Sequence, residues 1–176
     1  AILKVLFVLI FVNTVFAISP EVKWVDEEKT GVNINSTDPK VTSFRECVSK
    51  GFSTENKFEV RLCKPRSLWF DKCDEVLTLL KQVGKDPISG KLSLLVDVLG
   101  DGEDPEERSL QSEEDALEAL RSSGLVPISL EGRKLSVRVT ETCKGSYSST
   151  VRRISRILSL GVIEFRGDTS GWIEFE

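Results

Sequence analysis

The chain has 176 residues, of which 40% are hydrophobic and 30% charged, and its formal net charge is -4 at neutral pH. A mildly acidic chain without a basic stripe is a poor candidate for nucleic-acid binding. Histidine is absent, which excludes Ser-His and Cys-His nucleophile pairs, histidine zinc sites and histidine-ligated haem. Any catalysis would rest on cysteine, lysine or carboxylate groups.

Residues 1–17 predict a secretory signal peptide. In AILKVLFVLIFVNTVFA one lysine precedes an apolar run, and small residues stand at the signal-peptidase site. This run is shorter than the roughly 20 residues that span a bilayer, which favours cleavage over anchoring. We expect a mature chain in the secretory lumen or outside the cell, with no membrane span after cleavage.

The domain organisation predicted from composition is simple. Residues 18–40 are polar and contain two prolines, and we expect them to form a loosely attached arm. Residues 41–176 are expected to form a single α/β domain, with a core over 58–160 and a C-terminal β-hairpin over 162–176. Within the arm, Asn35 begins the tripeptide NST, which predicts an N-glycosylation site in a secreted chain.

The first half of the domain predicts two strands, a helix and a further strand. VTSFREC (41–47) and KFEVRLC (57–63) alternate as strands do. SLWFDKCDEVLTLLKQVG suggests a helix over residues 67–83, since its apolar residues fall on one helical face. These residues are Trp69, Cys73, Val76, Leu77, Leu80 and Val83. KLSLLVDVL (91–99) is almost continuously apolar, which predicts a strand buried on both faces.

The second half predicts helices and strands in alternation. SEEDALEALRSSG predicts a helix that Ser112 caps and Gly124 ends, and LVPISLEGRKLSVRV predicts two strands around a Glu-Gly turn. SSTVRRISRILSLG (148–161) has the apolar spacing of another helix. The closing sequence, IEFRGDTSGWIEFE, predicts two strands on either side of a turn.

From residue 58 the predicted order is strand, helix, strand, helix, strand, strand, helix. FEVRL runs into CKPRS, and GLVPISL places Pro127 at the start of a later strand. In these features the chain resembles the thioredoxin-like superfamily. Cys63 matches the position of its redox nucleophile, Pro127 that of its cis-proline, and Arg66 stands where the resolving cysteine of Cys-Gly-Pro-Cys would be. A ferredoxin-like α+β plait over residues 90–176 is the alternative fold.

The resemblance implies a binding module more than an enzyme, because Arg66 breaks the dithiol motif. We expect a protein partner and no cofactor. The enzymatic alternative is a monothiol redox or isomerase activity, in which a helix N-terminus, Lys64 and Arg66 favour the Cys63 thiolate and Pro127 shapes a peptide-binding edge. Against it, four cysteines in a secreted chain predict two disulfides.

The four cysteines are Cys47, Cys63, Cys73 and Cys143. Only Cys143 lies in the second half, so one bridge must join the halves if all four pair. The spacing leaves the connectivity open.

Two further motifs could bind a receptor or a metal ion. Arg166, Gly167 and Asp168 form an RGD tripeptide, which on a turn would present a guanidinium and a carboxylate to an integrin-type receptor. Turn composition alone accounts for the same residues. The acidic loop from Asp101 to Glu107 fails the EF-hand spacing, since Pro105 stands where an oxygen ligand is required. No metal site is expected.

Overall fold

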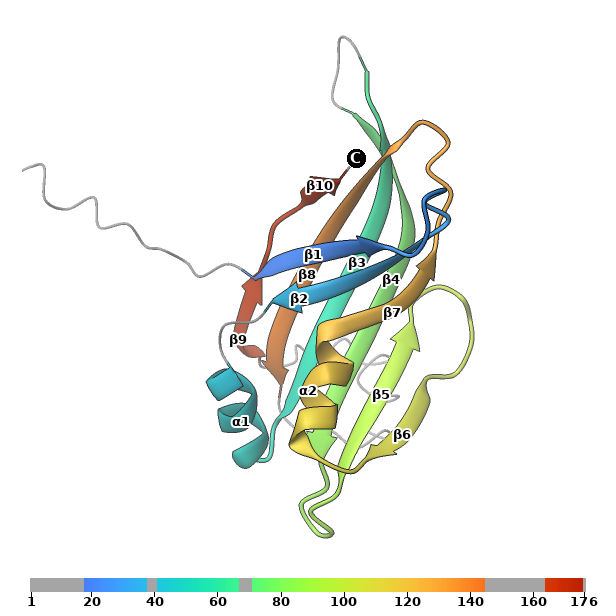
Figure 1. The fold of residues 1–176 in the computed structure, drawn as a ribbon. Helices are drawn as coiled ribbons and strands as arrows, with labels where there is room; N and C mark the ends of the chain where they lie inside the picture. The colour runs from blue at the N-terminus through green and yellow to red at the C-terminus, as the bar shows by residue number, and fades with distance from the viewer. Residues whose placement is uncertain (1–17, 38–40, 67–70, 145–163, 176) are drawn as a thin grey trace, which may run out of the picture.

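The computed structural model describes residues 18–37, 41–66, 71–144 and 164–175, which form ten strands and two helices. The strands are β1 (Ser19–Trp24), β2 (Gly31–Thr37), β3 (Ser53–Lys64), β4 (Lys72–Lys85), β5 (Leu92–Val98), β6 (Glu106–Leu110), β7 (Ser122–Pro127), β8 (Lys134–Lys144), β9 (Glu164–Thr169) and β10 (Ile173–Phe175), and the helices are α1 (Val41–Ser49) and α2 (Glu113–Arg121). They build two antiparallel sheets (Figure 1).

The large sheet has the order β10-β8-β3-β4-β5-β6, and β9 also pairs with β8. Its centre is the long hairpin of β3 and β4. Alternation along β3 places Phe58, Val60 and Leu62 on one face, where each is at most 2% exposed. The residues between them carry charge and form the opposite face of the sheet.

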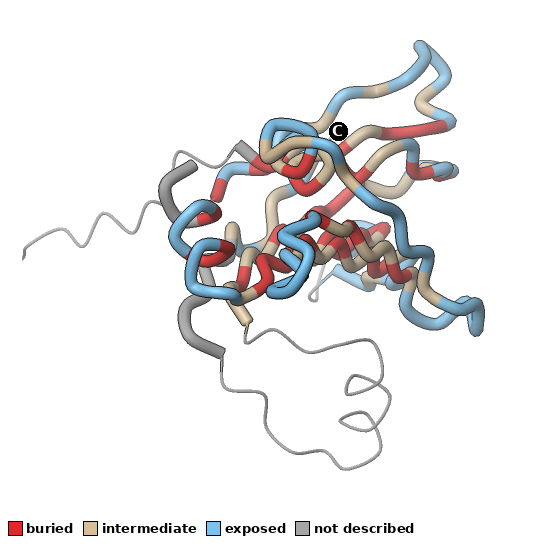
Figure 2. The backbone as a smooth tube through the Cα atoms, turned by 90° about the horizontal axis from the view of Figure 1, so that it is seen from below, coloured by how far each residue is buried: buried red, intermediate tan, exposed pale blue. Residues whose placement is uncertain are grey.

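The small sheet, in the order β1-β2-β7, lies across the apolar face of the large sheet (Figure 1). Val32 and Ile34 of β2 and Val126 of β7 enter the main core, which also contains Phe58 and Val60. The residues of this cluster are buried, and Figure 2 shows that most loops are exposed. Burying both apolar faces against each other is the main source of stability.

The helices close the remaining part of the apolar face. Phe44 of α1 and Ala116 and Leu120 of α2 form a second core cluster with Val83 and Leu94 of the large sheet. Helix α2 begins as its sequence predicts, because the Ser112 side chain accepts a hydrogen bond from the Asp115 amide at 3.1 Å.

Two polar side chains of the large sheet hold the C-terminal end of α2. Lys81 Nζ donates to the carbonyls of Ala119 at 3.1 Å and Ser122 at 2.6 Å, and Asn56 Nδ2 donates to the Leu120 carbonyl at 3.0 Å. These donors satisfy carbonyls that a helix end leaves without partners. Burial lowers the pKa of Lys81 from 10.5 to about 8, with a smaller contribution from Arg108.

The thioredoxin-like fold predicted from the sequence is wrong. Of the helices expected between residues 58 and 160, the described residues contain only α2, and residues 72–85 are a strand in place of a helix. Pro127 ends β7 of the small sheet, and no described peptide bond is cis. The ferredoxin-like plait over residues 90–176 fails too, because β7 leaves the large sheet to join β2.

Three local predictions were also wrong. Residues 41–47 belong to helix α1, and residues 18–40, expected to be a polar arm, supply β1 and β2. The closing strands β9 and β10 do not pair with each other as a hairpin would, because β9 pairs with residues 140–144 of β8 and β10 with residues 135–137. The predicted signal peptide and the helix at 148–161 lie outside the described residues.

Candidate binding groove

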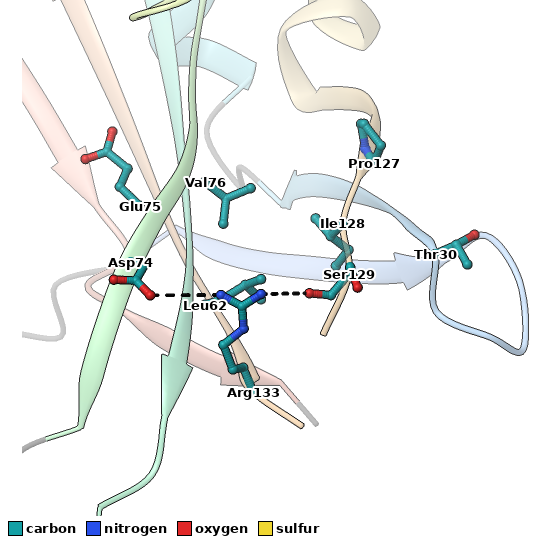
Figure 3. Close-up of a pocket in the computed structure, with 9 residues that line it drawn as sticks. All are labelled: Thr30, Leu62, Asp74, Glu75, Val76, Pro127, Ile128, Ser129 and Arg133. Atoms are coloured by element: carbon teal, nitrogen blue, oxygen red, sulfur yellow. Dashed lines mark hydrogen bonds and ion pairs between the residues drawn. The ribbon is translucent and has the colours of Figure 1, made fainter. Parts of the chain in front are cut away.

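A groove of about 520 Å³ opens where the apolar face of the large sheet runs out beyond the small sheet (Figure 3). Strands β3 and β4 form one wall, and the end of β7 with the loop that follows forms the other. The lining residues are Thr30, Leu62, Asp74, Glu75, Val76, Pro127, Ile128, Ser129 and Arg133. Four of the nine residues are apolar, so part of a ligand bound in the groove would be shielded from water, and polar groups surround that part.

A β-bulge in β4 shapes the first wall. The register of the β3–β4 pair shifts between Val60 and Arg61, which face Leu77 and Glu75, so that Val76 is the extra residue. Figure 3 shows Val76 pointing from β4 toward the wall that carries Ile128. Its 42% exposure is high for an apolar strand residue. Bulges commonly redirect a side chain beside a functional site.

Asp74 carries a carboxylate onto the face of the large sheet that packs into the main core. It pairs in register with Leu62, which is 2% exposed, and both residues line the groove. Because directly opposed residues share a face, Asp74 stands in line with the core residues of β3. Its side chain is 56% exposed, so the carboxylate remains open to solvent and to a ligand. Glu75 points to the other side of β4 in Figure 3.

Arg133 joins the two walls. Its Nη1 lies 3.9 Å from Asp74 Oδ2, while its Nη2 donates to the Ser129 carbonyl at 3.3 Å and its Nε to the Leu130 carbonyl at 3.3 Å. Glu131 adds a carboxylate oxygen 3.7 Å from Nη2. These contacts fix the plane of the guanidinium beside Asp74, as Figure 3 shows. A donor and an acceptor are thereby held next to each other at one end of an apolar floor.

The β1–β2 turn forms the far rim. The Asp26 carboxylate accepts hydrogen bonds from the Thr30 hydroxyl and from the Thr30 amide, the latter at 2.9 Å. These bonds hold the pKa of Asp26 below its usual value. The Ile128 amide donates to the Thr30 carbonyl at 3.0 Å, which connects the rim to the second wall. The groove is therefore built from elements that hydrogen bonds already fix.

The predicted redox centre is not formed. Cys63 is bonded to Cys73, its register partner on β4, with 4.0 Å between the Cα atoms. Cys63 therefore supplies no free thiol, and it begins no helix. Pro127 lines the groove, whereas Cys63 does not. Because Cys63 and Cys73 follow Leu62 and Asp74 in the register of the two strands, the bridge joins β3 and β4 on the face of the sheet opposite the groove.

The second disulfide joins Cys47 of α1 to Cys143 of β8, across 96 residues. The prediction that one bridge ties the halves of the chain together is thus confirmed, as is the formation of two disulfides. Such bridges are compatible with an extracellular or secreted protein.

The other predicted site residues lie away from the groove. Asn35 is half-buried on β2, where it alternates with the buried Ile34 and Ser36 and so belongs to the outer face of the small sheet. The RGD tripeptide lies within β9, where Arg166, Gly167 and Asp168 pair with Cys143, Thr142 and Glu141 of β8. The tripeptide therefore occupies a paired strand and not a turn.

On the opposite face of the large sheet, a charged cluster contacts Trp172, which lies between β9 and β10. Arg138 donates to Glu59 through Nε at 2.6 Å and Nη2 at 2.8 Å, and this hydrogen bonding keeps the pKa of Glu59 below its ordinary value. Trp172 stacks on two guanidinium groups, with its ring centre 3.7 Å from Cζ of Arg61 and 4.6 Å from that of Arg138. The cluster fixes the short connection between β9 and β10.

Three findings bound the chemistry of the described residues. None of the described helices is long and apolar enough to cross a membrane. The described histidine, cysteine, aspartate and glutamate side chains form no group of three or more that would hold a metal ion. Comparisons with protein-family models, with curated proteins and with solved structures found no match, so nothing supports the thioredoxin-like resemblance.

Proposed function

We propose that this protein is a binding module of the secretory lumen or the extracellular space, and that its groove takes up a peptide segment of a protein partner. The observation that carries this proposal is the groove itself, in which the exposed Val76 and Pro127 stand beside a donor and an acceptor over the buried Leu62 and Ile128. Val76 and Pro127 would contact an apolar side chain of the ligand, and Leu62 and Ile128 form the buried floor beneath them. The volume of the groove lies within the range of ligand-binding pockets, which combine apolar side chains with a few placed polar groups.

The Asp74–Arg133 pair favours a peptide over a purely apolar ligand. A peptide group presents an N–H donor and a C=O acceptor a few ångströms apart. Asp74 can accept from the first and Arg133 can donate to the second, because their charged groups lie 3.9 Å apart and face the same groove. A ligand without polar groups would bury this pair, which would lose its hydrogen bonds to water and gain none from the ligand.

The export proposal rests on three features. The first 17 residues have the pattern of a signal peptide, two disulfides form, and Asn35 begins an acceptor sequence at a half-buried position on the outer face of β2. We infer that Asn35 carries an N-linked glycan when the chain is made in a eukaryotic secretory pathway.

Selection of peptides from a random displayed library on the immobilised disulfide-bonded protein tests the groove. Binding of the enriched peptides is then measured with the Val76→Asp variant. We expect the affinity to fall about tenfold or more, because a charge replaces an apolar contact in the groove.

The matched control is Ile88→Asp, which introduces the same charge at an aliphatic residue that is 96% exposed on the turn at the opposite end of β4. Peptide binding should be unchanged in this variant. Equal melting temperatures for the three proteins would exclude unfolding as the cause. Failure to enrich any peptide, or equal affinity for the wild type and Val76→Asp, would overturn the proposal.

A further inference from the structure

The outer face of the small sheet carries an exposed apolar patch at one end, formed by Val25 and Leu125. Their side chains are 57% and 66% exposed. They flank Gly31, since a Cβ atom built on Gly31 would lie 2.8 Å from Leu125 Cδ1 and 3.7 Å from Val25 Cγ2. The two aliphatic groups therefore meet over a residue without a side chain. Exposed apolar residues that gather in this way mark interaction surfaces more often than single ones do.

The patch is continuous with the groove. Pro127 pairs in register with Gly31 and therefore shares its face, and Leu125 lies two residues before Pro127 on the same strand. Pro127 is exposed and also lines the groove. Val76 and Pro127 both line the groove, so Pro127 connects the groove with the face that carries the patch. Residues two apart on a strand are separated by about 7 Å, which is also the spacing in an extended ligand.

The other end of the same face is set apart by Asn35. Gly31 and Asn35 lie four residues apart on β2, or about 13 Å along the strand. A glycan on Asn35 would cover its own end of the small sheet and leave the Val25 and Leu125 end open. The surface available to a partner therefore extends from the groove toward the patch.

We propose that the patch is a second subsite for the same extended peptide segment. The segment crosses the end of the small sheet, with one apolar residue against Pro127 in the groove and another, two positions away, over Gly31 against Leu125 and Val25. This inference rests on the proposed function and adds the sequence pattern of the ligand. A second copy of this chain or a lipid surface would not require two apolar residues at that fixed spacing.

The test uses the peptides enriched on the groove. We expect them to share two apolar residues two positions apart, and we expect replacement of either residue by serine to weaken binding. The protein variants Leu125→Ser and Val25→Ser should each lower the affinity about tenfold, which corresponds to 1.4 kcal/mol and lies near the value for burying one aliphatic side chain. Ile88→Ser, at an aliphatic residue outside the path, is the control and should bind like the wild type.

The outcomes separate the two proposals. If Val76→Asp abolishes binding while Leu125→Ser and Val25→Ser leave it unchanged, the groove binds peptides and the second subsite is refuted. Peptides with only one essential apolar residue would refute it in the same way. If no variant changes binding, both proposals fail. Saturable dimerisation or vesicle binding that Leu125→Ser removes, without an effect on peptide affinity, would assign the patch to another partner and overturn the inference.

Discussion

Removing the two disulfides separately should give unequal losses of stability. The Cys47–Cys143 bridge closes a loop across 96 residues and the Cys63–Cys73 bridge one across 10. If a bridge acts by restricting the unfolded chain, these loops correspond to about 4.7 and about 2.7 kcal/mol of unfolding free energy at 25 °C. The difference of about 2 kcal/mol depends only on the ratio of the loop lengths.

Packing losses should largely cancel in this comparison. Each bridge joins one buried cysteine, Cys47 at 4% exposure or Cys63 at 0%, to a half-buried one, Cys143 or Cys73. Replacing both cysteines of a pair by alanine therefore removes similar buried groups in the two variants. The main difference that remains is the loss of chain entropy that each bridge imposes on the unfolded state.

Equilibrium unfolding in urea, followed by circular dichroism, measures the effect. The Cys47→Ala, Cys143→Ala variant should lose about 2 kcal/mol more free energy of unfolding than the Cys63→Ala, Cys73→Ala variant. If the Cys47→Ala, Cys143→Ala variant is already unfolded without urea, that result also agrees with the prediction. Equal losses, or a larger loss on removing the short loop, would refute the reasoning. The cause would then lie in the folded state, where the Cys63–Cys73 bridge holds the groove wall together.

Two further predictions concern Lys81 and Asn35. Since the pKa of Lys81 is about 8 in the fold and 10.5 ordinarily, the unfolded chain binds more protons between these pH values, and stability should rise with pH across this window. In chemical unfolding, the free energy of unfolding of the wild type should rise by about 1 to 2 kcal/mol between pH 8 and 10.5, relative to that of Lys81→Met, after allowance for solvent screening. If the two proteins show the same dependence of this free energy on pH, the assignment to Lys81 is contradicted. When the chain is expressed in eukaryotic secretory cells, glycosidase treatment should increase its gel mobility and Asn35→Gln should abolish that change, whereas a wild type insensitive to glycosidase would disprove modification.

Elements with local signals were predictable. The capping serine and acidic first turn of α2, the apolar run of β5 and the Glu-Gly turn between β7 and β8 all follow from neighbouring residues, and the structure has them where the sequence places them. Strands β1 and β2 also have a usable sequence signal, because Val22 and Trp24 alternate with exposed residues and Val32 and Ile34 alternate with half-buried asparagines. The many polar residues of this segment, with Pro20 and Pro39, predict an arm instead.

The errors came from segments that satisfy two periodicities. In residues 72–85, Leu77, Leu80 and Val83 fit one side of a helix, but Leu77, Leu79 and Val83 also fit one face of a strand. Pairing with β3 decides between them, and that partner lies far away in the chain. Residues 41–47 show the reverse case, since Phe44 and Cys47 lie one helical turn apart and both are buried.

Most of the groove could not be predicted for the same reason. Asp74 has no distinguishing motif, and its place on the apolar face follows only from its register with Leu62 and from the bulge at Val76. Arg133 reaches Asp74 across 59 residues of sequence. Pro127 was singled out by a family resemblance that does not hold, although the structure does place it in the groove.

The bridge between Cys47 and Cys143 turns most of the fold into a covalent ring. Every groove-lining residue except Thr30 belongs to this ring. A protease that nicks one exposed turn, such as the one carrying Ile88, would leave both fragments attached to each other. In surroundings rich in proteases, the two walls of the groove would therefore stay joined after a first cut.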